Sequence, residues 1–167
     1  INALNKLQAI IANNPTDDIK SIVLNDMVNL YIDDGAYEEA KKTLNDCYEL
    51  ALRINDEQGI RYSEYLKGRL YHLQNDYKNS YKTIFAMLKN NNTFDEEYFI
   101  YINEFISLLI DMKEYNHGFE FVEKYFEEVV KSDYLENKLI FFKNALRIQI
   151  ALNFKKRRGV CYDSETL

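Results

Sequence analysis

Glycine and proline are scarce in this chain of 167 residues, which has five glycines and one proline. Sandwiches and barrels of this size need many tight turns built on these two residues, so both folds are excluded. A disordered chain is excluded as well, because 47% of the residues are hydrophobic and 14% are aromatic. The length is sufficient for one domain with its own core. The composition therefore predicts a single all-α domain.

Cysteine is almost as rare. Cys47 and Cys161 do not make the disulfide framework of a small secreted domain, so we expect a core thiol and a tail thiol in a reducing compartment. No run of 18 apolar residues exists, and the most apolar stretch, 99–110, is interrupted by polar residues, which favours a buried helix over a membrane span. No signal-peptide pattern precedes Pro15, and the missing initiator Met indicates a fragment or processed chain. The simplest expectation is a cytoplasmic protein.

Positive charge is in deficit, and the net charge is −6. Nucleic acids and anionic membranes need a basic face, so neither is expected as a direct partner. One basic cluster, 155–158, lies at the end of the last predicted helix. We interpret it as favourable charge at a helix C-terminus continuing into a solvated tail, and a nucleic-acid patch is the less favoured alternative.

A repeated segment is the clearest positive signal. It consists of a polar turn, a tyrosine, two polar residues and a small residue, and it occurs at 34–40, 74–80 and 112–118. The N-terminal segment fits the second half of the same unit, so the small positions are Ala3, Ala40, Ser80 and Gly118, with spacings of 37, 40 and 38 residues. Apolar residues at helical spacing precede each turn. Each unit is therefore predicted to be a helix, a short turn and a second helix.

This periodicity predicts eight antiparallel helices. Their expected spans are about 1–13, 18–34, 37–54, 58–74, 77–90, 95–112, 115–131 and 134–156. The last helix has no partner in the sequence, so we expect it to cap the stack. Residues 1–156 then form the repeat domain, and we interpret 157–167 as a basic linker or tail and the start of a following domain.

The pattern resembles the tetratricopeptide repeat family over roughly residues 1–131. Gly68 and Tyr71 match the first helix of that family's unit, and the turn and second helix are matched by Tyr37 with Ala40, Tyr77 with Ser80 and Tyr115 with Gly118. The chain departs from the family at Val28 and Ile106, which replace the first-helix glycine, and its period exceeds the family's usual length of about 34 residues. The resemblance implies an α-α superhelix, a TPR-like solenoid, whose first helices line a concave surface.

Under this resemblance, the inward positions of the first helices are candidates for binding a protein or peptide. They are Asn25, Asn29, Tyr62, Tyr65, Arg69, Asn103 and Ser107. Asparagine offers a donor and an acceptor to an extended peptide backbone, and tyrosine offers a large rigid contact with a polar tip. The alternative is that these side chains face solvent or the capping helix.

Signals for catalysis are weak. His72 and His117 lie in different units without metal-ligand spacing, and Cys47 occupies a packing position. The glycines are scattered, so no phosphate-binding loop is present. Neighbouring glutamates on a helix point apart and make poor acid–base pairs. We therefore expect no enzyme, no metal site and no cofactor.

The last residues carry one further resemblance. Segment 162–167 is similar to the opening of a GGDEF diguanylate cyclase domain, Asp-x-Leu-Thr-Gly-Leu. Asp163, Thr166 and Leu167 match it, and the glycine between Thr and Leu is absent. The resemblance implies that the chain is the N-terminal regulatory region of a bacterial signalling protein.

Three functional hypotheses follow. The first is a non-catalytic protein- or peptide-binding repeat domain that regulates an attached output domain, such as a GGDEF cyclase. The second is the peptide-sensing domain of a quorum-sensing transcription regulator. The third is a structural scaffold or self-association module, which leaves a homodimer open.

Overall fold

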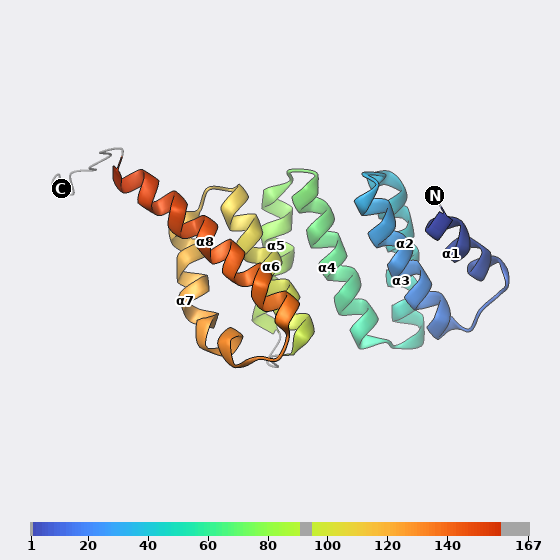
Figure 1. The fold of residues 1–167 in the computed structure, drawn as a ribbon. Coiled ribbons are helices and arrows are strands. Elements are labelled where there is room, and N and C mark those ends of the chain that lie inside the picture. Colours follow the sequence, from blue (N-terminus) through green and yellow to red (C-terminus); the bar gives the residue numbers. More distant parts are fainter. Residues whose placement is uncertain (1, 91–94, 158–167) are drawn as a thin grey trace. The chain divides into compact units, whose positions relative to one another are not determined.

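The computed structural model of this chain describes residues 2–90 and 95–157. Within them the regular structure is helical, without strands (Figure 1). The eight helices are α1 (Asn2–Ala12), α2 (Asp17–Asp33), α3 (Tyr37–Ile54), α4 (Glu57–Leu73), α5 (Tyr77–Asn90), α6 (Glu96–Asp111), α7 (Tyr115–Lys131) and α8 (Leu135–Arg157). The predicted all-α class is confirmed, and each observed helix end lies within one residue of its expected position.

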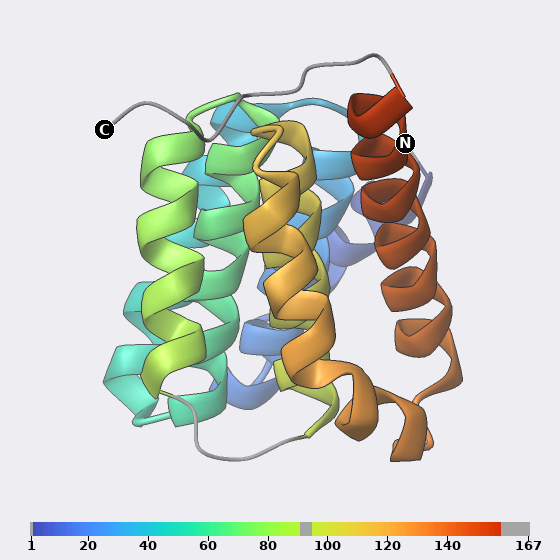
Figure 2. The same ribbon diagram turned by 90° about the vertical axis from the view of Figure 1, so that its left-hand side faces the viewer.

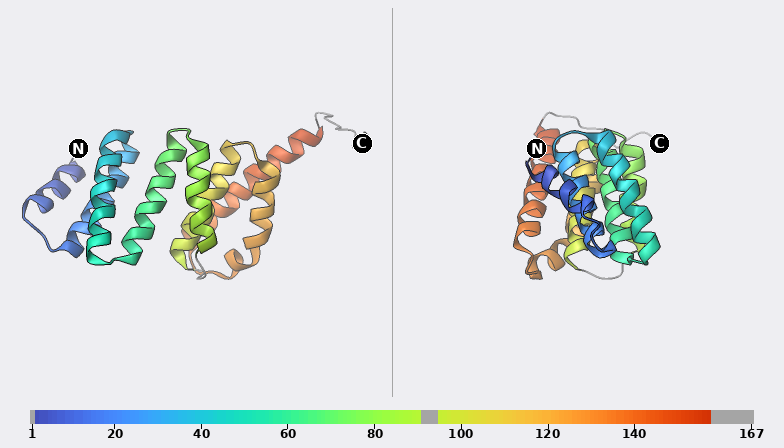
Figure 3. Two further views of the ribbon diagram at one scale, coloured as in Figure 1. Left: turned by 180° about the vertical axis from the view of Figure 1, so that it is seen from behind. Right: turned by 90° about the vertical axis from the view of Figure 1, so that its right-hand side faces the viewer.

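The chain divides into two compact units, Ile1–Met87 and Leu88–Leu167, with the boundary inside α5. In the first unit α1 packs on α2, α2 on α3 and α3 on α4, and in the second α6 packs on α7 and α7 on α8 (Figures 1 and 3). This packing in sequence order is that of an α-α superhelix. Alternate helices also touch within each unit, α2 with α4 and α6 with α8. The predicted domain limits at 156 and 157 stay predictions, since residues 158–167 lie outside the described part.

The turns inside the three helix pairs share one backbone geometry. Gly35, Asn75 and Lys113 have positive φ angles of 72°, 61° and 62°. The amide after each donates to a carbonyl five residues earlier, Ala36 to Tyr31 at 2.8 Å, Asp76 to Tyr71 at 2.9 Å and Glu114 to Leu109 at 2.8 Å. These bonds are those of the Schellman motif, which satisfies carbonyls at the end of a helix. The predicted repeated turn is thus present three times.

The predicted small position is buried in all three second helices. Ala40 and Ser80 are completely buried, and Gly118 is buried as well. A methyl group added at Gly118 would lie 2.8 Å from Cδ1 of Ile148 on α8. The tyrosines that open these helices are half-buried, and the Tyr77 ring lies 6.0 Å from the His72 ring of α4, within its own pair. Small residues here give the neighbouring helices room to approach, as predicted.

The core of the first unit includes a cluster of Leu24, Cys47 and Leu50, with Ile11 and Ile54 packed against it. This cluster joins α1, α2 and α3. Cys47 is fully buried and free of any disulfide, so the expected core thiol is confirmed. Cys161, the expected tail thiol, lies outside the described residues.

The core of the second unit is built on α6. Six of its side chains are completely buried, Phe99, Ile102, Phe105, Ile106, Leu108 and Leu109. Phe141 and Ile148 of α8 are equally buried against this core, and Figure 2 shows α7 in orange and α8 in red from the side. The stretch 99–110 is therefore a buried helix, as predicted. No helix in the described ranges has the length and apolarity needed to cross a membrane.

Candidate functional site

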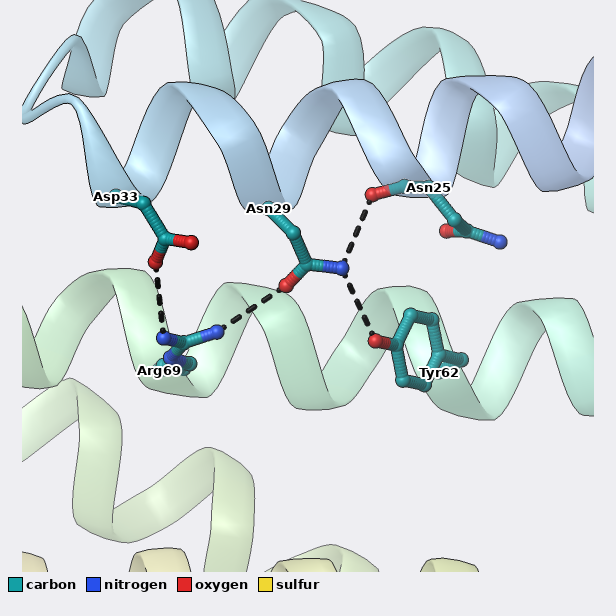
Figure 4. A network of polar contacts seen from close by, with 5 residues as sticks. All are labelled: Asn25, Asn29, Asp33, Tyr62 and Arg69. Carbon is teal, nitrogen blue, oxygen red and sulfur yellow. Dashed lines mark hydrogen bonds and ion pairs between the residues drawn. The ribbon is translucent and has the colours of Figure 1, made fainter. Parts of the chain in front are cut away.

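Five polar residues link α2 to α4 in the first unit, and we call them the α2–α4 network (Figure 4). They are Asn25, Asn29, Asp33, Tyr62 and Arg69. The three from α2 are spaced four residues apart, so they lie along one face of that helix. Four of the five were predicted as binding residues from the sequence, and their spacing on two packed helices brings them together.

Asn29 is the centre of the network. Its Nδ2 donates to the Tyr62 hydroxyl at 3.1 Å and to the Asn25 backbone carbonyl at 3.2 Å. Its Oδ1 accepts from Nη1 of Arg69 at 3.1 Å. The Asn29 amide is therefore held in one orientation by groups on both helices.

Arg69 connects the network to its exposed end. Its Nη2 lies 3.5 Å from Oδ1 of Asp33, and the two side chains are 28% and 65% exposed. An ion pair this exposed contributes little to stability, on the order of 1 kcal/mol or less. Its consequence is geometric, because Asp33 and Asn29 together fix the guanidinium at the edge of the α2–α4 surface.

Asn25 is directed partly into the core. The Cys47 thiol donates to its Oδ1 at 2.9 Å, and the Ser63 hydroxyl lies 3.6 Å from the same sulfur. Burial raises the pKa of Cys47, the Ser63 hydrogen bond lowers it, and the charge of Asp56 raises it further. The thiol therefore stays protonated at neutral pH, so it can donate its proton to Asn25.

The two predicted tyrosines of α4 lie at different depths. Tyr62 is half-buried and reaches the network, whereas Tyr65 is buried and has 7% of its surface exposed. Their rings lie 5.7 Å apart. The buried Tyr65 ring therefore packs against the Tyr62 ring, and of the two residues Tyr62 has its hydroxyl at the surface.

The remaining predicted residues, Asn103 and Ser107, are on α6 in the second unit. Asn103 is only 5% exposed, because α8 covers it. Its Nδ2 donates to the Asn137 backbone carbonyl at 3.0 Å, and its backbone carbonyl accepts from Nδ2 of Asn144 at 3.4 Å. Ser107, one turn later, is half-buried. Asn103 therefore faces the C-terminal helix, which is the alternative that the sequence left open.

The two units repeat one arrangement. Arg147 of α8 lies 3.6 Å from Asp111 of α6, as Arg69 of α4 lies 3.5 Å from Asp33 of α2, and both pairs span the same separation in sequence. In each unit the aspartate is the last residue of the first helix of a pair. The arginine lies on the helix two places further along the chain. The predicted binding positions thus lie along seams between alternate helices, and α8 occupies in its unit the place that α4 occupies in the other.

Sequence reasoning missed a pocket between α3 and α4. It encloses about 190 Å³. Its lining is Lys41, Leu44, Asn45, Tyr48, Ser63, Glu64, Lys67, Leu70, Tyr71 and Gln74. The α3 residues of this lining recur at helical spacing on one face. An ordinary solvent-facing helix has the same spacing, so the sequence did not indicate a pocket here.

Metal ligands are not gathered anywhere in residues 2–90 and 95–157, where no three His, Cys, Asp or Glu side chains are placed to hold an ion. The chain matches no protein-family model, and a search among curated proteins finds no significant match. A functional proposal for this chain therefore rests on the geometry of the α2–α4 network.

Proposed function

We propose that this chain is a non-catalytic helical repeat domain, similar to tetratricopeptide repeats, that binds an extended segment of another protein or a peptide. The observation that carries the proposal is the α2–α4 network, in which Asn29, Tyr62 and Arg69 are held in fixed orientations at a half-exposed surface. Groups fixed before binding lose little conformational entropy on binding, so they favour affinity. The three equivalent turns support the repeat character.

The surface beside the network indicates which guest it fits. Ile22 and Ile19 of α2 are 62% and 48% exposed, and they continue the same helical face as Asn29 and Asp33. A guest can therefore place an apolar side chain on these isoleucines and a polar group near Tyr62 and Arg69. The Tyr62 hydroxyl accepts from Asn29 and retains its own proton for donation to a guest carbonyl.

Regulation of an attached output domain belongs to the same proposal. Its basis is the sequence of 162–167, which resembles the start of a GGDEF domain and lies outside the described residues. A peptide sensor in a transcription regulator would use the same α2–α4 surface. Reading the parent gene on both sides of this chain separates the two, since one requires a cyclase domain downstream and the other a helix-turn-helix upstream.

Selection from a phage library of random peptides tests the binding surface. Peptides enriched on the wild-type protein are synthesised, and their Kd is measured by fluorescence anisotropy. Tyr62→Phe removes one hydroxyl and Arg69→Gln removes one charge, and each is expected to weaken binding about tenfold. Asn45→Ala is the matched control, because it alters the α3–α4 pocket instead.

Two results would contradict the proposal. One is an absence of enriched peptides, and the other is binding that Asn45→Ala abolishes while Tyr62→Phe and Arg69→Gln leave it unchanged. The second result would transfer the site to the α3–α4 pocket. Circular dichroism of each variant ensures that the compared proteins are folded.

A further inference from the structure

Helix α8 carries apolar side chains on two opposite faces. Phe141 and Ile148 on one face are completely buried. On the other face Leu135, Leu139 and Leu146 are 68%, 62% and 60% exposed, and Phe142 and Ile150 are exposed as well. We call this second set the outer face of α8. Isolated apolar residues on a surface are ordinary, but a continuous stripe of five along one helix marks an interaction site.

The correspondence between α8 and α4 indicates what this face is for. The sequences of α8 and α4 can be aligned by matching Arg147 with Arg69. The buried positions of α8 then match buried positions of α4: Asn137 with Gly59, Phe141 with Ser63, Asn144 with Leu66 and Ile148 with Leu70. The same alignment places Leu146 on Gly68 and Ile150 on His72. In α4 these two residues face α5, through Ile84 and Tyr77. The outer face of α8 is therefore the surface on which a further helix packs.

The packing that this surface favours differs from that of α4 with α5. Gly68 lets α5 approach the α4 backbone, whereas Leu146 at the equivalent position holds a partner helix further away. Leu135, Leu139, Phe142 and Leu146 follow a spacing of four, three and four residues. This spacing produces the narrow seam of a coiled coil, with side chains that interlock with those of a facing helix.

A second copy of α8 fits this seam. The spacing reads the same in both directions, so two antiparallel helices related by a two-fold axis place Leu135 against Leu146 of the other copy and Leu139 against Phe142 of the other copy. Glu136 and Lys143 lie on one flank of the stripe, and this register brings Glu136 of each copy near Lys143 of the other. A parallel pair would place Lys143 of one copy beside Lys138 of the other, and the helix dipoles also favour the antiparallel arrangement.

The area is close to what a stable dimer needs. Phe126 and Val130 of α7 are 43% and 47% exposed, and the Phe126 ring lies 6.0 Å from that of Phe142, so α7 widens the middle of the surface. The seven side chains together expose on the order of 600 Å² per copy, near the roughly 800 Å² per partner of specific interfaces. We propose that two copies of this chain form an antiparallel, two-fold symmetric dimer through the outer face of α8.

Sedimentation equilibrium over the micromolar range tests the dimer. The wild-type protein is expected to approach twice the chain mass of 19.9 kDa, and Leu139→Lys and Leu146→Glu are each expected to give 19.9 kDa. Leu52→Lys is the matched control, because Leu52 is 47% exposed on α3 in the other unit, and it should leave the dimer intact. All three positions are exposed, so the helical circular dichroism signal should not change.

A charge-swap series tests the orientation. Glu136→Lys and Lys143→Glu are each expected to raise the dimer Kd several-fold, and the double variant should return it toward the wild-type value. A wild-type protein that stays at 19.9 kDa at every concentration overturns the proposal. A dimer that survives Leu146→Glu, or that Leu52→Lys disrupts, overturns this interface. Single and double charge variants with equal Kd values overturn the antiparallel register.

Discussion

A methyl group on the Cα of Gly68 would lie 2.7 Å from Cγ1 of Ile84. Gly68 is in α4 and Ile84 is a fully buried residue of α5, so these helices touch through the bare backbone of one of them. Cγ1 lies in the middle of a β-branched side chain that has little freedom at χ1. The contact therefore leaves no space for a larger residue at 68.

Gly68→Ala should destabilise the protein by about 1 kcal/mol, because overpacking costs about 1–3 kcal/mol and alanine regains about 1 kcal/mol of helix propensity. Gly118→Ala is the control. Its added methyl group meets Cδ1 of Ile148, a terminal atom that can rotate away, so its stability should stay close to that of the wild type. Urea unfolding followed by circular dichroism measures both variants, and equal stabilities would contradict this difference in packing.

Lys113→Gly should stabilise the protein by about 0.5–1 kcal/mol. Lys113 has a φ of 62° in the turn between α6 and α7, and a side chain with a Cβ is strained in that conformation. Glycine occupies the equivalent turn position at Gly35, where φ is 72°. Lys113→Ala is the control, since alanine keeps the Cβ and should give no gain. Thermal unfolding that ranks the alanine variant at or above the glycine variant would show that the backbone strain is not the cause.

Ser80→Ala should also stabilise the protein, by about 1 kcal/mol. Ser80 is completely buried, and among the described residues its Oγ has no hydrogen-bond partner. Removing such a hydroxyl relieves a desolvation penalty, and Ala40 shows that alanine fits the equivalent position of α3. Ser63→Ala is the matched control, because the buried Ser63 hydroxyl donates to Cys47 and its loss should lower the melting temperature. A fall in melting temperature for Ser80→Ala would indicate that the hydroxyl is bonded.

The helices could be predicted because their signals are local. The recurrence of a polar turn, a tyrosine and a small residue placed every helix pair, and the structure has an αL residue at each such turn, even where it is Asn75 or Lys113 instead of glycine. The small residues at 40, 80 and 118 are buried because a neighbouring helix lies over them. The turns depend on residues close together in the sequence, and the repeat itself marks the small positions, so one sequence is enough to predict both.

The surfaces were harder to predict because they depend on which helix packs where. Asn25, Asn29 and Asn103 look alike in the sequence, since each is an asparagine at a predicted inward position. In the structure Asn25 accepts from a core thiol, Asn29 bridges two helices and Asn103 lies under α8. The outer face of α8 could not be predicted either, because a helix with apolar residues on two faces has no strong hydrophobic periodicity. The contacts of α8 with α6 and α7 show which of its faces is buried.

The stability of the second unit should fall at alkaline pH through Tyr98. Its buried hydroxyl donates to the Leu88 carbonyl at 3.2 Å and lies 3.0 Å from the Tyr125 hydroxyl. Burial raises the pKa of Tyr98, the Tyr125 hydroxyl raises it further, and Lys124 lowers it slightly. The folded protein therefore keeps this proton after the unfolded chain has lost it, so stability is complete below about pH 10 and falls by up to about 1.4 kcal/mol for each pH unit above that.

Tyr98→Phe isolates this contribution. The variant should be less stable than the wild type at neutral pH, because Tyr125 and the Leu88 carbonyl each lose a hydrogen bond. Its stability should decline less steeply between about pH 9 and pH 11, since the ionising group is gone. Tyr48→Phe, which removes a half-buried hydroxyl from the other unit, is the control and should follow the wild-type slope. Parallel slopes for Tyr98→Phe and the wild type in urea unfolding would show that the Tyr98 proton is not retained on folding.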